Sequence, residues 1–288
     1  MPVTPKIPRL VLLFAIFGLT SAVTLTGCSQ NKTENQTQNQ TQNQTAPAAP
    51  AAPATSTPLP THPDTVVVRM GEYLKTLTSF AITIENSYDE ALPSGLKIQY
   101  LASGVITVRR PDRLRADMSS DDGDRSIIYD GKSLTVYGKT LNVYAAVDAP
   151  PTLDEMFNKV LNEYNLGLPL VDILYQSVHG TLLDNVEAGI VLGRSRIGGV
   201  ECDHVAFHQA DVDWQLWVEA SATPLPRRIV ITTLGEPGQP QYEVDMKWNL
   251  SPTIDDSMFA FVPPGDAARI KLATLAAQVE AATDSSKK

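Results

Sequence analysis

The sequence predicts an α+β fold, in which a curved antiparallel sheet of about ten strands carries one N-terminal helix and an inserted pair of helices. Runs of alternating apolar and polar residues fill much of residues 80–146 and 188–250. Short turn sequences separate these runs, which favours antiparallel neighbours. Two other stretches, 64–77 and 152–174, have apolar residues at helical spacing instead.

The composition describes an acidic chain that is long enough for a large hydrophobic core. It has 288 residues, of which 43% are apolar, and a net charge of −9 from 23 basic and 32 acidic residues. General nucleic-acid binding needs a basic face, so we expect no nucleic-acid partner. Two cysteines exclude a disulfide-rich scaffold.

Residues 1–27 have the pattern of a secretory signal. Lys6 and Arg9 precede an apolar run at 10–19, which is too short for a comfortable membrane span. The following Leu-Thr-Gly-Cys sequence ends at Cys28 and resembles the bacterial lipobox. That resemblance implies an acylated Cys28 as the first mature residue, a membrane as partner, and a location in the cell envelope facing the periplasm. Ser29 in place of Asp favours the outer membrane.

Residues 28–61 are expected to form a disordered tether. An Asn-Gln-Thr repeat fills 30–45, and a Pro/Ala-rich stretch fills 46–60. Neither part has a hydrophobic period that could bury a core. We therefore place the folded domain at 62–268 and a peripheral C-terminal helix or tail at 269–288, because residues 266–282 are Ala-rich and weakly amphipathic.

The first half of the domain is predicted to be a helix followed by a strand meander. The helix at 64–77 has one apolar face, and Asp130-Gly131 is a strong hairpin signal. We expect Gly104 to mark a bulge. The predicted strands are 80–85, 96–108, 113–118, 125–129, 134–137 and 141–146.

The second half is predicted to begin with the inserted helices and to return to strands. Thr152 and Glu155 form a capping box before an apolar stripe that ends at Tyr164, and a short helix follows Pro169. The predicted strands of this half are 188–196, 200–209, 213–219, 225–232 and 242–250.

Several segments, in this order, resemble the LolA-like periplasmic proteins. They are GVITVRRPDRLRADM at 104–118, IIYDGKSLTVY at 127–137, LNVY at 141–144, and FAFVPPG at 259–265. The stretches at 199–219 and 224–232 are similar to an uncharacterised family of predicted periplasmic proteins with this fold. The resemblance implies a half-open barrel with a helical lid, which in LolA encloses the acyl chains of lipoproteins.

The resemblance and the apolar pattern together suggest residues that line a ligand cavity. The sheet candidates are Val105, Ile128, Leu216, Val218 and Ile229, and the lid candidates are Met156, Phe157, Val160 and Leu161. An apolar strand face can equally be a filled core, so the sequence leaves both alternatives open. The resemblance also implies that Arg110, in an Arg-Pro pair, contacts the lid.

One cluster has residue types that could bind a metal ion. Cys202, His204 and His208 share one face of a strand, but Cys202 and His208 lie about 20 Å apart along it by the rise per residue. They cannot share one metal ion without further ligands, and no cofactor is expected. Nucleophile-elbow, zinc-protease and P-loop motifs are absent from the sequence.

We therefore expect a non-enzymatic lipoprotein that binds an apolar ligand, such as a lipid or an acyl chain, under a helical lid. Such a protein would act in lipid or lipoprotein transport or in envelope maintenance. The alternative is an envelope sensor or interaction scaffold with a filled core and a protein partner. A hydrolase with an unrecognised carboxylate pair is a third alternative.

Overall fold

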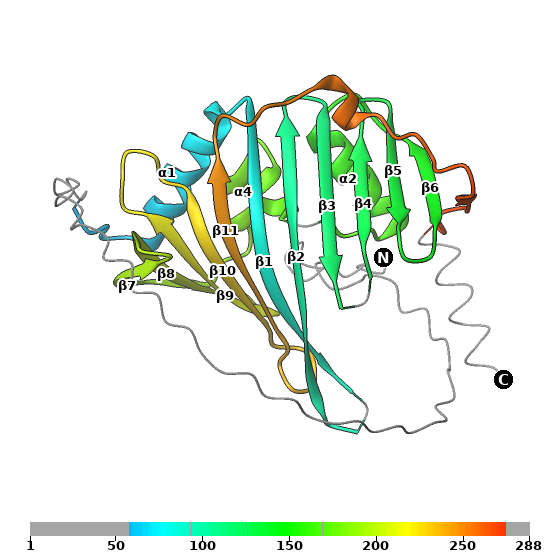
Figure 1. Ribbon diagram of the computed structural model, residues 1–288. Coiled ribbons are helices and arrows are strands. Elements are labelled where there is room, and N and C mark those ends of the chain that lie inside the picture. The colour runs from blue at the N-terminus through cyan, green and yellow to red at the C-terminus, as the bar shows by residue number, and fades with distance from the viewer. Residues whose placement is uncertain (1–57, 93, 122, 169, 275–288) are drawn as a thin grey trace, which may run out of the picture. The chain divides into compact units, whose positions relative to one another are not determined.

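The computed structural model describes residues 58–274, except 93, 122 and 169. Its described part holds one twelve-stranded sheet, with the helices on one face (Figure 1). The strand order is β12-β6-β5-β4-β3-β2-β1-β11-β10-β9-β8-β7. The strands are β1 (Ser79–Ala91), β2 (Lys97–Arg109), β3 (Arg113–Ser120), β4 (Arg125–Tyr129), β5 (Ser133–Gly138), β6 (Val143–Asp148), β7 (Ala188–Ile197), β8 (Val200–His208), β9 (Val212–Glu219), β10 (Pro226–Thr233), β11 (Gln241–Asn249) and β12 (Ala268–Arg269).

The sheet consists of two antiparallel meanders that meet at β1. Strands β1 to β6 follow one another on one side, and β7 to β11 follow one another on the other. The two halves join because β1 pairs with β11 from Ala81 to Tyr88. The first strand of the chain therefore lies at the centre of the sheet, and the expected α+β class with an antiparallel curved sheet is confirmed.

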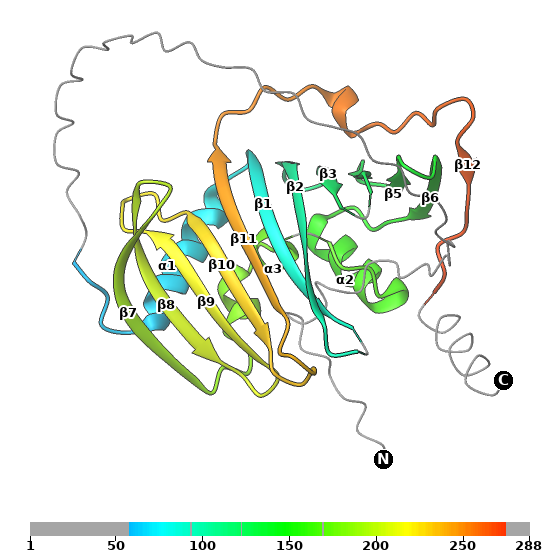
Figure 2. The same ribbon diagram turned by 60° about the horizontal axis from the view of Figure 1, so that its bottom comes forward.

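The segment between β6 and β7 covers one face of the sheet for a topological reason. Those two strands lie near opposite ends of the strand order, so their connection must cross the face between them. It contains α2 (Leu153–Tyr164), α3 (Val171–Leu174) and α4 (Val178–Leu182), and Figure 2 shows the sheet curving around these helices. We call residues 153–182 the inserted segment, and the face that it covers the helix-covered face.

Helix α1 (Pro63–Thr76) begins with a proline and packs its apolar stripe inward. Pro63 has a fixed φ that suits the first turn, and Asp64 and Lys75 complement the helix dipole. The helix lies against β7, β8 and α4. Its buried residues are Val66, Val67, Met70, Gly71 and Leu74.

An ion pair ties α1 to the sheet. The carboxylate of Asp203 on β8 is fully buried, and it accepts hydrogen bonds from Arg69 at 2.8 Å and from Arg194 at 3.0 Å. Two guanidinium groups thus compensate the desolvation of one buried carboxylate.

The Thr152 half of the predicted capping box at the start of α2 is confirmed, but the Glu155 carboxylate accepts from the Thr152 hydroxyl, where a full box has the Thr152 backbone N–H as donor. The Thr152 hydroxyl oxygen accepts a hydrogen bond from the Glu155 backbone N–H, and it donates one to the Glu155 carboxylate at 2.8 Å. The helix ends at Asn165 in the left-handed conformation. Its inward stripe is Leu153, Met156, Phe157 and Val160.

The predicted bulge at Gly104 is wrong. Gly104 pairs in regular register with Ile84 on β1 and Met118 on β3. A Cβ there would come within 2.4 Å of the Asp117 carbonyl oxygen and 2.5 Å of the Met118 Sδ, so glycine is required by a close approach. The irregularities lie elsewhere, between Val191 and Gly193 and between Pro226 and Arg228.

The chain after β11 does not form the start of the predicted peripheral helix. Residues 250–274 lie along the sheet instead, and we call them the strap. A 3₁₀ helix at Asp256–Phe259 lies near β3, and Phe261 packs between the rings of Tyr137 and Tyr144. The strap then adds β12 in parallel to β6. These contacts fix an extended backbone at 268–269, where the Ala-rich composition favoured a helix. Residues 275–288 lie outside the described residues.

No helix within the described ranges is long and apolar enough to cross a membrane. The predicted signal, Cys28 and most of the tether lie outside the described residues.

Replacing Gly104 tests the close packing at the centre of the sheet. We expect Gly104→Ala to lower the free energy of unfolding by about 1–3 kcal/mol, because the added methyl group collides with the neighbouring strand. Urea denaturation measures the change. Gly235→Ala is the matched control, since no atom lies within 4 Å of its Cβ position. Equal midpoints for the two variants would contradict the assignment.

Candidate functional site

The helix-covered face carries most of the residues predicted to line a cavity. Leu216 and Val218 on β9 and Ile229 on β10 are buried on it. Met156, Phe157 and Val160 on α2 are buried, whereas Leu161 is partly exposed.

Two predicted cavity residues lie on the wrong face. Val105 pairs with Asp117 and is 43% exposed, and Ile128 pairs with Arg115. Alternation places both on the outer face, opposite the inserted segment. Ile128 is nevertheless buried, because its face of β4 lies next to the strap, whose Met258 carbonyl accepts a hydrogen bond from Arg115. Their assignment to the cavity is therefore wrong.

The inserted segment packs closely against the sheet where α3 and α4 meet β9, β10 and β11. The cavity that remains there has a volume of about 20 Å³, which is roughly the room for one water molecule. At this place the described residues leave no room for an acyl chain. The lining of the cavity is Leu170, Asp172, Ile173, Leu182, Trp214, Ile229, Ile231, Tyr242 and Val244.

Most of this lining was missed as a site from the sequence. Ile229 is the one predicted residue among them. Tyr242 and Val244 alternate with the polar Glu243 on β11, so period two could have placed them on the inner face. The path of the chain after α2 determines which parts of the inserted segment contact these residues. Local periodicity does not predict that path.

Trp214 contributes an unusual polar group to this apolar cavity. Its ring stacks on Phe207 at 4.2 Å between centroids and is almost fully buried. The indole Nε1 is buried and has no hydrogen-bond acceptor among the described residues. A buried donor without a partner destabilises the closed arrangement.

Polar contacts join the end of α3 to neighbouring elements. The Arg110 Nη2 donates to the Leu174 carbonyl oxygen at 2.8 Å, and the backbone N–H of Gln176 donates to the Asp154 carboxylate at 3.2 Å. Burial lowers the pKa of Arg110, while the charge of Asp154 acts in the opposite direction. The structure thus places Arg110 against the inserted segment.

The cysteine and histidine cluster lies on the outer face of β8. Burial raises the pKa of Cys202 to about 11, so its thiol stays protonated at neutral pH. The His204 ring stacks on Trp217 at 3.9 Å, and His208 contacts the Asp213 carboxylate at 2.6 Å. Within the described residues, no group of three His, Cys, Asp or Glu side chains could hold a metal ion.

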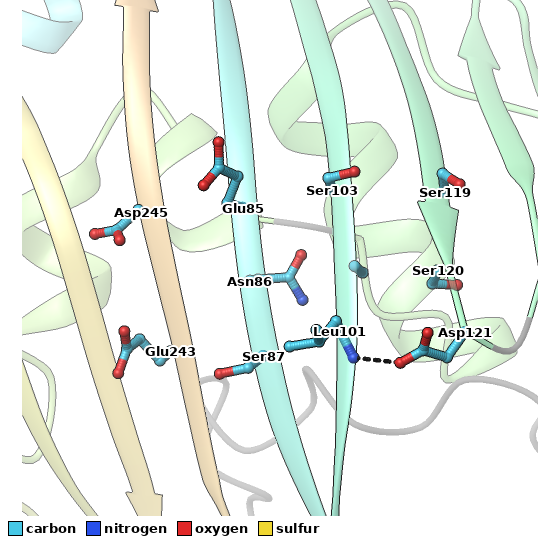
Figure 3. Close-up of a pocket in the computed structure, with 11 residues that line it drawn as sticks. Glu85, Asn86, Ser87, Leu101, Ser103, Ser119, Ser120, Asp121, Glu243 and Asp245 are labelled. Carbon is cyan, nitrogen blue, oxygen red and sulfur yellow. Dashed lines mark hydrogen bonds between the residues drawn. The ribbon is translucent and has the colours of Figure 1, made fainter. Parts of the chain in front are cut away.

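A larger hollow of about 520 Å³ lies on the outer face over β11, β1, β2 and β3 (Figure 3). Its walls are mostly polar, and several of its carboxylates already have partners. Glu85 pairs with Lys247, and Asp245 pairs with Arg228. An acyl chain gains less from this mixed surface than from an apolar one, so the apolar candidate site is the helix-covered face.

Residues 64–273 match the model of the family described as "Predicted periplasmic protein (DUF2092)". The chain belongs to this family. The match confirms the resemblance to an uncharacterised family of predicted periplasmic proteins. A search of curated proteins finds no match.

Solved structures that are similar to this DUF2092 member include three bacterial proteins. An uncharacterised conserved protein from Thermus thermophilus is 10% identical, with a TM-score of 0.43, over 72% of this chain and 97% of that one. The lipoprotein LppX of Mycobacterium tuberculosis is 13% identical, with a TM-score of 0.44, over 67% and 97%. A LolA superfamily protein from Nitrosomonas europaea is 12% identical, with a TM-score of 0.35, over 70% and 99%.

The two outer-face histidines should affect stability in opposite directions as the pH changes. Burial lowers the pKa of His204, although its hydrogen bond with Gln215 acts in the opposite direction. Its stabilising effect is therefore present above the unfolded value of about 6.5 and is lost as the pH falls. The Asp213 carboxylate raises the pKa of His208, whose effect is present below the unfolded value and lost as the pH rises.

We therefore expect His204→Phe, which can keep the ring stack on Trp217, to lose less stability than the parent protein between pH 7 and pH 5. His208→Gln should lose more over the same range. Chemical denaturation at several pH values measures both slopes. Parallel slopes for the two variants would exclude this assignment.

Proposed function

We propose that this protein is a periplasm-facing binding protein for an apolar ligand of the acyl-chain class, and that the ligand enters by displacing the inserted segment from the helix-covered face. The family description gives a periplasmic location. The proposal adds a class of ligand and a place where it binds. The closed arrangement is then the ligand-free state.

The proposal rests on the kind of chain that packs against the helix-covered face. The part of the inserted segment after α2 contributes many buried apolar side chains, but its helices are short. Helix α3 has four residues and α4 has five. Its buried apolar residues are Leu166, Leu168, Leu170, Ile173, Leu174, Tyr175, Val178 and Leu182.

Such a segment can exchange with a ligand at modest free-energy cost. Helices of four and five residues are not stable alone, so α3 and α4 depend on their apolar contacts with the sheet. An apolar ligand can replace contacts of this kind. An acyl chain of twelve carbons that replaces these side chains contributes about 9 kcal/mol of gross hydrophobic free energy. The strands beneath stay paired, so the sheet is the fixed part of the site.

The anchor and the absence of catalysis belong to the same proposal. Acylation at Cys28 would hold the domain at the periplasmic side of a membrane, with the outer membrane favoured, and residues 28–61 would set its reach. Binding and release then need no bond-breaking residue.

We expect Cys28→Ala to move the protein from the membrane fraction to the soluble periplasmic fraction, because the variant has no site for acylation. Retention of the variant in the membrane would contradict acylation at Cys28.

A second function is favoured by one observation, the cavity of only about 20 Å³. Close packing of this kind is also what an envelope sensor or interaction scaffold would have, with its outer surface docking a protein partner. In that case the inserted segment is permanent core, and it should not open for a ligand.

Titration of the purified full-length protein with a fluorescent fatty acid separates the two functions. Saturable binding with one ligand per chain, together with faster amide exchange at 166–182, supports the exchange mechanism. A lack of saturable binding, with a protein free of co-purified lipid in native mass spectrometry, would overturn it and leave the scaffold.

Loosening the inserted segment should raise apparent affinity. Ile173→Ala removes contacts between α3 and the sheet, which destabilises the closed arrangement. Less of the binding free energy is then spent on opening it, so the apparent affinity for the ligand rises. Ile128→Ala is the matched control, because this isoleucine is equally buried but lies on the outer face. We expect both to destabilise the protein by about 2–5 kcal/mol. Only Ile173→Ala should bind fatty acid more tightly, by tenfold or more. Equal gains in the two variants would contradict the site.

A further inference from the structure

Arg110 is only partly satisfied in the closed arrangement. Its Nη2 has the Leu174 carbonyl oxygen as acceptor. Its Nε and Nη1 are buried and have no hydrogen-bond partner within residues 58–274 as described. Each of these atoms carries a proton that must be donated, since a guanidinium has donors and no acceptor.

The surroundings of this guanidinium are apolar on one side and acidic on the other. Its central carbon lies 5.9 Å from the centroid of the Phe80 ring. Asp154 is the carboxylate whose charge acts on it, but Asp154 accepts its hydrogen bond from the Gln176 backbone N–H instead. A positive charge with unused donors therefore lies where the inserted segment meets the sheet.

We propose that this protein binds acyl chains that carry an anionic head group, a carboxylate or a phosphate, and that Arg110 is the residue that binds the head group. This inference rests on the proposed function, because the chain must first displace the inserted segment. When α3 leaves, the Leu174 carbonyl releases Nη2. An anion can then accept from Nη2 together with Nε or Nη1, in the paired geometry that guanidinium offers to carboxylates and phosphates.

Charge complementarity supports an anion over a neutral group. The closed state leaves donors of a cation without acceptors, and an incoming oxyanion supplies acceptors and a countercharge together. A hydroxyl supplies one acceptor and no charge. Discrimination should therefore appear as a difference between ligands of equal chain length.

Three probes with the same twelve-carbon chain test this inference. Dodecanoate, dodecyl phosphate and 1-dodecanol compete against a neutral fluorescent probe on the full-length protein. We expect both anions to bind at least tenfold more tightly than the alcohol, and the ratio of the two anions shows which head group is preferred. Equal affinities for the three would overturn the inference while leaving the proposed function intact. Binding of none of them would overturn the proposed function itself.

Arg110→Gln separates recognition of charge from a structural role. Loss of the hydrogen bond to Leu174 changes the affinity of all three probes alike, because it loosens the inserted segment. Loss of head-group recognition instead reduces the anion-to-alcohol ratio to near one. Arg109→Gln is the matched control, since Arg109 is the adjacent arginine and pairs with Asp256 on the strap. An unchanged ratio in Arg110→Gln, or an equal drop in Arg109→Gln, would refute the role of Arg110.

Discussion

The structure depends on one constraint, the crossing of the sheet by the inserted segment. Strands β6 and β7 lie near opposite ends of the strand order, so residues between them must traverse the face that separates them. Burial of apolar side chains on both sides makes this crossing favourable. In the function proposed above, a ligand would use the same face of the sheet, so packing of the inserted segment and ligand binding would compete for it.

The two faces of the sheet are covered by different parts of the chain. The inserted segment covers one, and the strap after β11 covers part of the other, where Phe259 is buried and Phe261 packs against two tyrosines. A sheet covered in this way can have apolar residues on both faces. This explains why Ile127 and Ile128, neighbours on β4, are both buried although they point in opposite directions.

Sequence patterns predicted the fold well, because alternation, capping and turn residues are local. The Thr152 cap, the Asp130-Gly131 hairpin and the apolar stripe of α1 all occur where they were expected. The face of the sheet on which a residue lies is harder to predict, because it depends on the pairing register with other strands. Val105 and Ile128 were placed on the inner face because apolar runs on both faces give no alternation to read. The strap was missed because its contacts join Phe261 to strands more than a hundred residues earlier. The close packing of α3 and α4 against the sheet depends on the path of 166–182, which short helices and left-handed turns determine.

The central position of β1 has a consequence for how the chain becomes native. A strand made early must wait for residues 241–249 before its second edge is paired. The two meanders can each form from neighbouring hairpins, but their union is a contact between distant parts of the chain and is slow for reasons of loop entropy. When the polypeptide emerges from its N-terminus, the meander of β1 to β6 would thus be complete first, and one edge of β1 would stay open to solvent until residues 241–249 have been delivered.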